Sequence, residues 1–542
     1  MTAEVVVRLR REGYLLAEAS AGPSAFSDRQ SGEHGSVNKN GMGIVSAARD
    51  AALGAFRLWS VGQHIEAEET NHWLIEIEVL GPPEPLTVAG DWTQPGVIDS
   101  LFEPGVHGMV LRGPRGQRRF CPTQTFTSDA IVADTLKSLA QAIHSDSAQV
   151  VNTELFRFRT VHWYEPRSGA EIVFLHRGMT LIPASAVTDS GLSEAVARVA
   201  EYMAYRQRAS GLFAYQYEPA ADAYSEEDNL VRQAGATLAM AFHARHGGSS
   251  ASRAAADLSI RHHLDGLTEI RDVQHAAFIA TPDKRNKLGV TALLCAAMAH
   301  HPDADGFGTI RKKLVNGMLW LQRPSGIFLT AFPPAEEVDA QDYFPGEALV
   351  ALAAEYDREP LAQILDAFDR AVAFYRGYFR EAPSPAFVPW QVQAFCLMAK
   401  HTKRKDYVDF VFELTDWLAA MQLNESNCPW PELWGGVASY QPGHAGVATA
   451  SYLEGFTDAL RLARLVGDTG RAASYEQAVR GAARFVMQLQ VRPEEAYFVR
   501  SPKDAVWGIR TTPTLNLLRI DHCQHALIAL MKTRQVLFSE AG

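Results

Sequence analysis

The 542-residue sequence contains few cysteines and no long hydrophobic run. Its five cysteines, Cys121, Cys295, Cys396, Cys428 and Cys523, are scattered and form no CxxC motif, which argues against a disulfide framework. No window reaches the roughly 18 apolar residues that a membrane-spanning helix needs. The N-terminal stretch MTAEVVVRLRREGYLL lacks the apolar centre and cleavage site of a secretory signal. We therefore expect a cytoplasmic protein with no membrane partner.

Basic clusters are also missing, and the formal net charge is −11. Binding to a nucleic-acid backbone requires grouped lysine and arginine, so we expect no nucleic-acid partner. The composition, 47% hydrophobic and 21% charged, is that of a folded globular protein. Because the chain is longer than one ordinary hydrophobic core can hold, two or more domains are expected.

Alternating polar and apolar residues predict strands in the first third of the chain. Strands are expected over 72–83, 108–113, 154–166 and 171–178, where Val, Ile, Phe and Trp are frequent and Gly or Pro follows. Helical spacing of apolar residues predicts helices over 46–58 and 128–146. Together these elements predict an α+β domain that spans residues 1–185.

From about residue 194 the strand pattern ends and helix pairs follow one another. The second helix of each pair is rich in Ala, Gly and Leu and begins near residue 229, 286, 345, 389, 449 or 519. A repeat of this length indicates an array of similar units. Apolar second helices fit an inner ring and more charged first helices fit an outer ring. Residues 194–535 are thus predicted to form an all-α (α/α)6 toroid, with an open solenoid as the alternative. Each half is expected to have its own complete core.

Two resemblances add to this interpretation. The segments PGEALVALAAEY and ATASYLEGFTDALRLARLVGD resemble the six-hairpin toroid superfamily of glycoside hydrolases, polysaccharide lyases, sugar 2-epimerases and uronyl C5-epimerases. That resemblance implies an enzyme of carbohydrate metabolism. Residues 45–165 are similar to an AMMECR1-like domain in the order AARDAALGAF, LIEIEVLGPPEPL, PGVHGMVLRG and ELFRFRTVHWYE. The LRGCIG signature of that family is not matched, so no active residue is transferred from it.

The loops that lead into the inner helices should meet at one end of a toroid. They are rich in aromatic residues, arginine and carboxylates, which suit a concave site for a polyhydroxy molecule. The candidate catalytic residues are Glu347, Glu432, Asp521, His444 and His525. The candidate substrate-binding residues are Asn229, Arg232, Tyr343, Trp390, Gln391, Trp430, Trp434, Tyr452 and Arg519.

Three chemistries can use these residues. Glu347 with Glu432 or Asp521 could flank a glycosidic bond, with Glu347 as an ionised base near arginines and Glu432 as the proton donor between two tryptophans. His444 and His525 could remove and return a proton, as an epimerase requires. Cys428, His522, Cys523 and His525 contain the ligand types of zinc.

The leading expectation is a carbohydrate-active enzyme, a glycoside hydrolase or a sugar epimerase or lyase, that acts on a sugar or another small polar substrate without a cofactor. One alternative is an enzyme, with or without zinc, that modifies a peptide or amino-acid polymer in the same toroid. Another is a non-catalytic scaffold. A protein partner could bind through the N-terminal domain.

Overall fold

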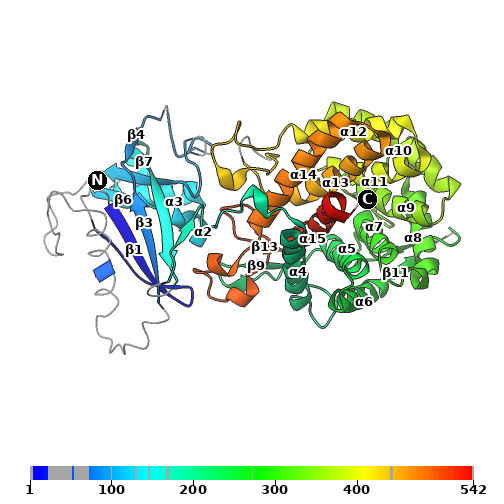
Figure 1. Ribbon diagram of the computed structural model, residues 1–542, viewed down its shortest axis with the longest axis horizontal. Coiled ribbons are helices and arrows are strands. Elements are labelled where there is room, and N and C mark those ends of the chain that lie inside the picture. Colours follow the sequence, from blue (N-terminus) through cyan, green and yellow to red (C-terminus); the bar gives the residue numbers. More distant parts are fainter. Residues whose placement is uncertain are drawn as a thin grey trace.

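The computed structural model describes residues 4–21, 52–53, 73–88, 90–94, 96–98, 101–128, 131–144, 147–166, 170–271, 273–439 and 444–539. The predicted helix over 46–58 lies outside these residues except for positions 52 and 53. Two parts are visible in Figure 1: a curled sheet that carries helices, and a larger ring of helices in which the last helix lies near the centre of the view. This arrangement confirms the predicted class of an α+β part followed by an all-α part.

Eight strands form the sheet, in the order β2-β1-β3-β7-β5-β6, and β4 and β8 also pair with the long β7. All of these pairings are antiparallel. The strands are β1 (Glu4–Arg11), β2 (Tyr14–Ala21), β3 (Trp73–Leu80), β4 (Glu84–Leu86), β5 (His107–Gly113), β6 (Gly116–Phe120), β7 (Glu154–Glu165) and β8 (Val173–Leu175). The four predicted strands correspond to β3, β5, β7 and β8. The predicted helix over 128–146 is shorter, α3 (Val132–Ile143), and a separate short helix, α2 (Thr123–Thr127), precedes it.

Within the described residues, twelve long helices alternate between an outer and an inner ring. The outer helices are α4 (Asp189–Tyr205), α6 (Ser250–Leu264), α8 (Gly308–Leu321), α10 (Ala362–Glu381), α12 (Lys405–Ala419) and α14 (Thr469–Leu489). The inner helices are α5 (Leu230–Gly247), α7 (Leu288–Ala299), α9 (Phe344–Arg358), α11 (Val388–Thr402), α13 (Ala448–Val466) and α15 (Ile520–Arg534).

Short elements connect the helices. The short strands are β9 (Gln216–Glu218), β10 (Ala223–Tyr224), β11 (Leu267–Glu269), β12 (Ala277–Ile279) and β13 (Leu518–Arg519). The short helical turns are η3 (Ser147–Asn152), η4 (Ala184–Ala186), η5 (Asp305–Phe307), η6 (Pro431–Leu433), η7 (Pro493–Glu495), η8 (Pro502–Asp504) and η9 (Gln535–Ser539).

The ring is closed. Each inner helix packs on the next, from α5 through α7, α9, α11 and α13 to α15, and α15 packs back on both α4 and α5. Composition explains the two rings, because all twelve residues of α7 are buried, whereas the outer helix α10 buries one side only, from Ile364 to Phe379. The predicted toroid is therefore confirmed, and every inner helix begins within about two residues of its predicted start. The open solenoid is excluded.

The sheet part has a core cluster of its own, which includes Met109, Phe120 and Leu136, but it is not fully separate from the toroid, because some of its residues pack into the toroid core. Phe126 and Tyr164 of the sheet part are buried together with residues of the toroid. The Tyr164 ring stacks on Tyr497 with 5.0 Å between centroids, and the Asn516 side chain donates a hydrogen bond to the Phe126 carbonyl. The domain boundaries themselves stay predictions.

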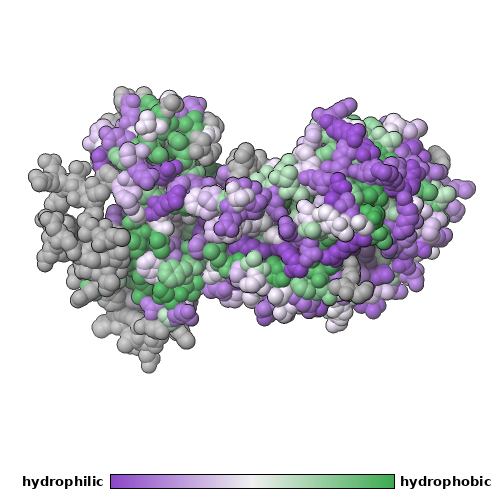
Figure 2. Space-filling model, turned by 45° about the horizontal axis from the view of Figure 1, so that its top comes forward, coloured by the Kyte–Doolittle hydropathy of each residue, from purple (hydrophilic) through white to green (hydrophobic). Residues whose placement is uncertain are grey.

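Hydrophilic residues cover most of the helical part on the face shown in Figure 2, and hydrophobic residues are interspersed on the sheet part. None of the helices in the described residues is both long and apolar enough to span a membrane.

Candidate active site

A polar pocket of about 340 Å³ opens where the first turns of the inner helices meet. Its walls come from α5, α7, α9, α11, α13 and α15 and from the loop residues just before them. The pocket is lined by Asn229, Val231, Arg232, Lys287, Leu293, Tyr343, Phe344, Glu347, Ala386, Pro389, Trp390, Val447, Ala448, Ser451, Tyr452, Arg519, Asp521, His522, Gln524 and His525. We call this the mouth pocket.

The mouth pocket brings together nine of the residues singled out from the sequence: Asn229, Arg232, Tyr343, Glu347, Trp390, Tyr452, Arg519, Asp521 and His525. They converge because each stands at or just inside the start of a parallel inner helix, so the same position in every repeat faces the same end of the ring. Asn229 has a structural task as well, since its side-chain oxygen caps α5 by accepting from the backbone N–H groups of Val231 and Arg232.

Asp521 is clamped by two arginines. Arg519 donates to both carboxylate oxygens, from Nε to Oδ1 at 2.6 Å and from Nη2 to Oδ2 at 2.8 Å. The Nε atom of Arg232 lies 3.2 Å from Oδ2. Burial would raise the pKa of Asp521, but His522, Arg519 and Arg232 outweigh it and hold the pKa below its ordinary value. Asp521 therefore remains ionised, with both oxygens occupied.

Glu347 is in the opposite situation. It is buried in the first turn of α9, and its Oε2 atom has no hydrogen-bond partner among the described residues. Burial raises the pKa of this carboxyl to about 8, and His525 opposes the shift only in part. Its space depends on Gly289, because a Cβ atom there would stand 2.3 Å from Oε2. At neutral pH Glu347 thus carries a proton inside the pocket.

His525 is oriented by a carboxylate behind it. Its Nδ1 lies 2.7 Å from Oε1 of the buried Glu454, so Nδ1 carries a hydrogen, and Nε2 is the acceptor when the ring is neutral. The ring of Trp390 meets the imidazole edge-on at 5.6 Å between centroids. Burial would lower the pKa of His525, but Glu454, Asp521 and Glu347 together raise it. Glu454 was not among the residues predicted for the site, so its contact with His525 was missed.

Two further ionisable residues, His522 and Lys287, line the pocket but were not among the candidate catalytic or substrate-binding residues. His522 is buried, and burial lowers its pKa to about 4, so its imidazole is neutral. Lys287 precedes α7 at the same position in the repeat as Asn229 before α5. An alignment of the repeats could have identified Lys287, because it stands directly before its inner helix, as Asn229 does.

Three predicted residues lie elsewhere. Glu432 belongs to η6, and its Oε1 accepts from Nε of Arg177 at 2.5 Å. The guanidinium groups of Arg159 and Arg177 both lie over the ring of Trp430, at 5.2 and 5.4 Å from its centroid. Trp434 donates its indole N–H to the Cys428 carbonyl. The segment around η6, drawn in yellow in Figure 1, extends from the ring toward the sheet part. Glu432 and Trp430 therefore contact the N-terminal part, and the pairing of Glu432 with Glu347 in one pocket is wrong.

Gln391 and His444 also lie outside the lining of the mouth pocket. Gln391 is buried in the first turn of α11 and its amide atoms have no hydrogen-bond partner among the described residues. His444 is half-buried in the loop before α13.

The residues proposed for zinc are separated. Cys428 packs near Trp430 beside Arg177 and Glu432, whereas Cys523 is buried near Arg206 and Asp521. In the part of the chain that the structure describes, no three His, Cys, Asp or Glu residues form a metal-binding group.

Comparisons with known proteins found similarity only to solved structures. Neither a protein-family model nor a curated protein sequence matches the chain. Among solved structures, it is similar to the α-1,6-mannanase of Salegentibacter sp. HEL1_6, with 10% identity, a TM-score of 0.46, and coverage of 64% of this chain and 99% of that chain. It is also similar to a D-mannose isomerase, with 13% identity, a TM-score of 0.47, and coverage of 66% of this chain and 100% of that chain. A third similar structure is cellobiose 2-epimerase from Spirochaeta thermophila DSM 6192, with 14% identity, a TM-score of 0.45, and coverage of 65% of this chain and 99% of that chain. The toroid assignment rests on the helix contacts described above.

Proposed function

We propose that the mouth pocket is the active site of an enzyme that transfers a proton on a small polyhydroxy substrate, such as a reducing sugar. The observation that carries this proposal is the pair of opposite acid–base groups, a protonated Glu347 and a carboxylate-oriented His525, which line one pocket. Proton transfer between carbon and oxygen requires one group that accepts and one that donates near neutral pH.

The reaction that needs only these two groups is an aldose–ketose isomerisation. Nε2 of His525 removes the proton from C2 of an open-chain aldose, and Glu347 gives its proton to the carbonyl oxygen, which yields an enediol. Glu347 then takes the proton from the C2 hydroxyl, and His525 returns its proton to C1. All atoms are conserved, and both residues recover their starting protonation. Epimerisation at C2 would additionally require protonation from the other face.

Glycoside hydrolysis is the less suitable chemistry for this pocket. A hydrolase requires a second carboxylate that acts as a base or nucleophile. Both oxygens of Asp521 are engaged by Arg519, and Oδ2 also by Arg232, which lowers the basicity of this carboxylate. Asp521 instead fixes the positions of these two guanidinium groups at the pocket. The aromatic rings of Trp390 and Tyr452 supply apolar walls that suit the faces of a sugar ring.

The test is hydrogen exchange at carbon. The full chain is incubated with neutral aldoses and uronic acids in D2O, and NMR follows loss of the C2 proton and the appearance of products. We expect deuterium incorporation with at least one reducing sugar, together with a ketose product. Release of new reducing ends from oligosaccharides without exchange at C2 would replace the proposal by hydrolysis. Absence of both reactions and of sugar binding would reject the sugar as substrate.

A further inference from the structure

A second pocket, of about 270 Å³, lies between the sheet part and the segment that carries η6. Its inner wall is formed by side chains of the sheet and α2, including Glu78, Thr123, Thr160 and His162, and its outer wall by Arg159 and Trp430. None of these residues lines the mouth pocket. We call this the interface pocket, and it is not used by the proton-transfer chemistry proposed above.

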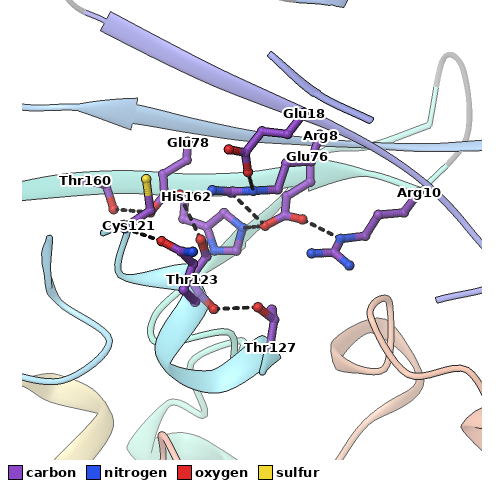
Figure 3. Close-up of polar contacts among 11 residues, drawn as sticks. Arg8, Arg10, Glu18, Glu76, Glu78, Cys121, Thr123, Thr127, Thr160 and His162 are labelled. Carbon is purple, nitrogen blue, oxygen red and sulfur yellow. Dashed lines mark hydrogen bonds and ion pairs between the residues drawn. The ribbon is translucent and has the colours of Figure 1, made fainter. Parts of the chain in front are cut away.

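Buried charges form the floor behind the inner wall, as Figure 3 shows. Arg8 contacts Glu76 and Glu78 at 3.3 and 2.9 Å, and Arg10 contacts Glu76 at 2.6 Å. Arg8 also binds the half-exposed Glu18 at 2.6 Å. The two guanidinium groups therefore face three carboxylates, and this network has a net charge of about −1. Such an arrangement favours a cationic group on the ligand side.

His162 adds a hydrogen-bond acceptor to this wall. Its Nε2 lies 3.0 Å from Oε1 of Glu76, and since an ionised carboxylate only accepts, Nε2 must carry the hydrogen. In the neutral ring Nδ1 is then the acceptor. The ring is held in place between Phe126 and Tyr497, with centroids 6.0 and 6.1 Å away.

The two threonines of the inner wall also face the pocket as acceptors. Thr123 donates its hydroxyl hydrogen to Oε2 of Glu78 at 2.9 Å, and Thr160 donates to Oε1 at 3.0 Å. Their hydrogens are therefore engaged, and only oxygen lone pairs remain. An inner wall of lone pairs and net negative charge is complementary to an ammonium group, which donates three hydrogen bonds.

The outer wall has the opposite character. Arg177 is neutralised by Glu103 at 2.6 Å and Glu432 at 2.5 Å. Arg159 is exposed and stacks on Trp430, with 5.2 Å from its central carbon to the ring centroid. Among the described residues, Arg159 forms no ion pair. It can therefore bind a carboxylate in the forked geometry typical of guanidinium groups.

From these two walls we propose that the interface pocket binds a small zwitterion, whose ammonium group contacts His162, Glu78 and the threonines, and whose carboxylate contacts Arg159. Phe126 and Trp430 supply apolar surface for the part of the ligand between these groups. Free α-amino acids and longer ω-amino acids share this chemistry. They differ in the distance between their two charges, so direct comparison identifies which source fits.

Calorimetric titration of the full chain tests the proposal. The probes are L-leucine and γ-aminobutyrate, together with isoamylamine and isocaproate, which each keep only one of the charged groups of leucine. We expect one zwitterion to bind at least about tenfold more tightly than either single-charge probe, because a lost charge-assisted hydrogen bond costs that much. Equal binding of isocaproate or isoamylamine, or no binding of either zwitterion at millimolar concentration, would overturn the proposal.

Arg159→Met isolates the outer wall without touching the buried network, because Arg159 is exposed. Arg261→Met on α6 is the matched control, since Arg261 is also exposed and lies outside both pockets. We expect Arg159→Met to weaken zwitterion binding by about tenfold or more and to leave isoamylamine binding unchanged. Arg261→Met should bind like the wild type. If Arg159→Met binds the zwitterion normally, the carboxylate does not contact this side chain and the proposal fails.

Discussion

A buried glutamate behind the interface pocket and a buried glutamate in the mouth pocket have pKa values shifted in opposite directions. Glu76, behind the interface pocket, is fully buried, yet Arg10, Arg8 and His162 outweigh the effect of burial and hold its pKa well below the ordinary value. Glu347, in the mouth pocket, is equally buried, but its pKa is raised to about 8. The difference shows that partners rather than burial decide the charge of a carboxyl group. A paired carboxylate can bind and orient, whereas an unpaired one keeps a proton that it can donate.

Removal of residues 1–186 should have the largest effect on this comparison. The cut would expose the surface of the toroid on which Phe126 and Tyr164 pack and would leave Glu432 without Arg177. Because this contact is part of the core, we expect the truncated chain to aggregate. Expression followed by size-exclusion chromatography and circular dichroism is the measurement. A soluble, monomeric toroid with a cooperative melting transition would show that the two parts are independent after all.

Substitution of the two proposed acid–base groups should follow in size. Glu347→Gln and His525→Asn are each expected to reduce turnover by about 100- to 10,000-fold, the usual contribution of a positioned acid or base. Exchange of the C2 proton in D2O provides the readout. Glu381→Gln serves as the control, because Glu381 is exposed at the end of an outer helix, and it should keep full activity. Wild-type turnover by Glu347→Gln would remove this residue from the mechanism.

The same chemical change, Glu to Gln, should affect stability differently in the two regions. Glu76→Gln leaves Arg10 without its buried counter-charge, whereas Arg8 keeps Glu78 and Glu18; breaking a buried pair in this way typically costs about 3 to 5 kcal/mol. Glu347→Gln removes a carboxyl that has no counter-charge, so we expect its free energy of unfolding at neutral pH to be unchanged or higher. Urea denaturation of both variants at one pH measures the difference. Equal destabilisation would mean that Glu347 is ion-paired like Glu76.

The pH dependence of stability gives a smaller but sign-specific effect. The pKa of Glu347 is higher in the folded protein than its ordinary value of 4.5, so the folded state binds this proton more tightly than the unfolded state. Its contribution is therefore complete below about pH 4.5 and is lost as the pH rises to about 8. Over this window the wild type should lose stability relative to Glu347→Gln. A parallel pH profile of the two proteins would contradict the raised pKa.

The ring and much of the mouth pocket could be predicted from the sequence, because both follow from the repeated helix pairs. Burial of whole helices such as α7 leaves a composition signal, and repeated helix starts place Arg232, Glu347 and Asp521 at the same end of the ring. Sequence reasoning failed where function depends on contacts between distant segments. Glu432 looked like a pocket residue because two tryptophans flank it, but Arg177, some 255 residues earlier, draws it to the sheet part.

The charge of Glu347 shows a second limit of the sequence. Arginines near the mouth suggested an ionised base, yet Arg519 and Arg232 both bind Asp521. The choice of the carboxylate that pairs with the arginines depends on side-chain distances of a few ångströms. Spacing along the chain does not determine these distances. The choice of His525 as a proton carrier was possible from its position, but its orienting partner Glu454 required the packing of α13 against α15.

The most direct test of the acid–base account is the titration of Glu347 itself. Infrared difference spectra of the full chain, recorded from pH 5 to 10 and compared with those of Glu347→Gln, isolate the carboxyl stretch of this one residue. The account predicts a protonated-carboxyl band at neutral pH that disappears with a pKa of about 8 and is absent from the variant. A Glu347 that is fully ionised at pH 6, with no such band, would contradict it.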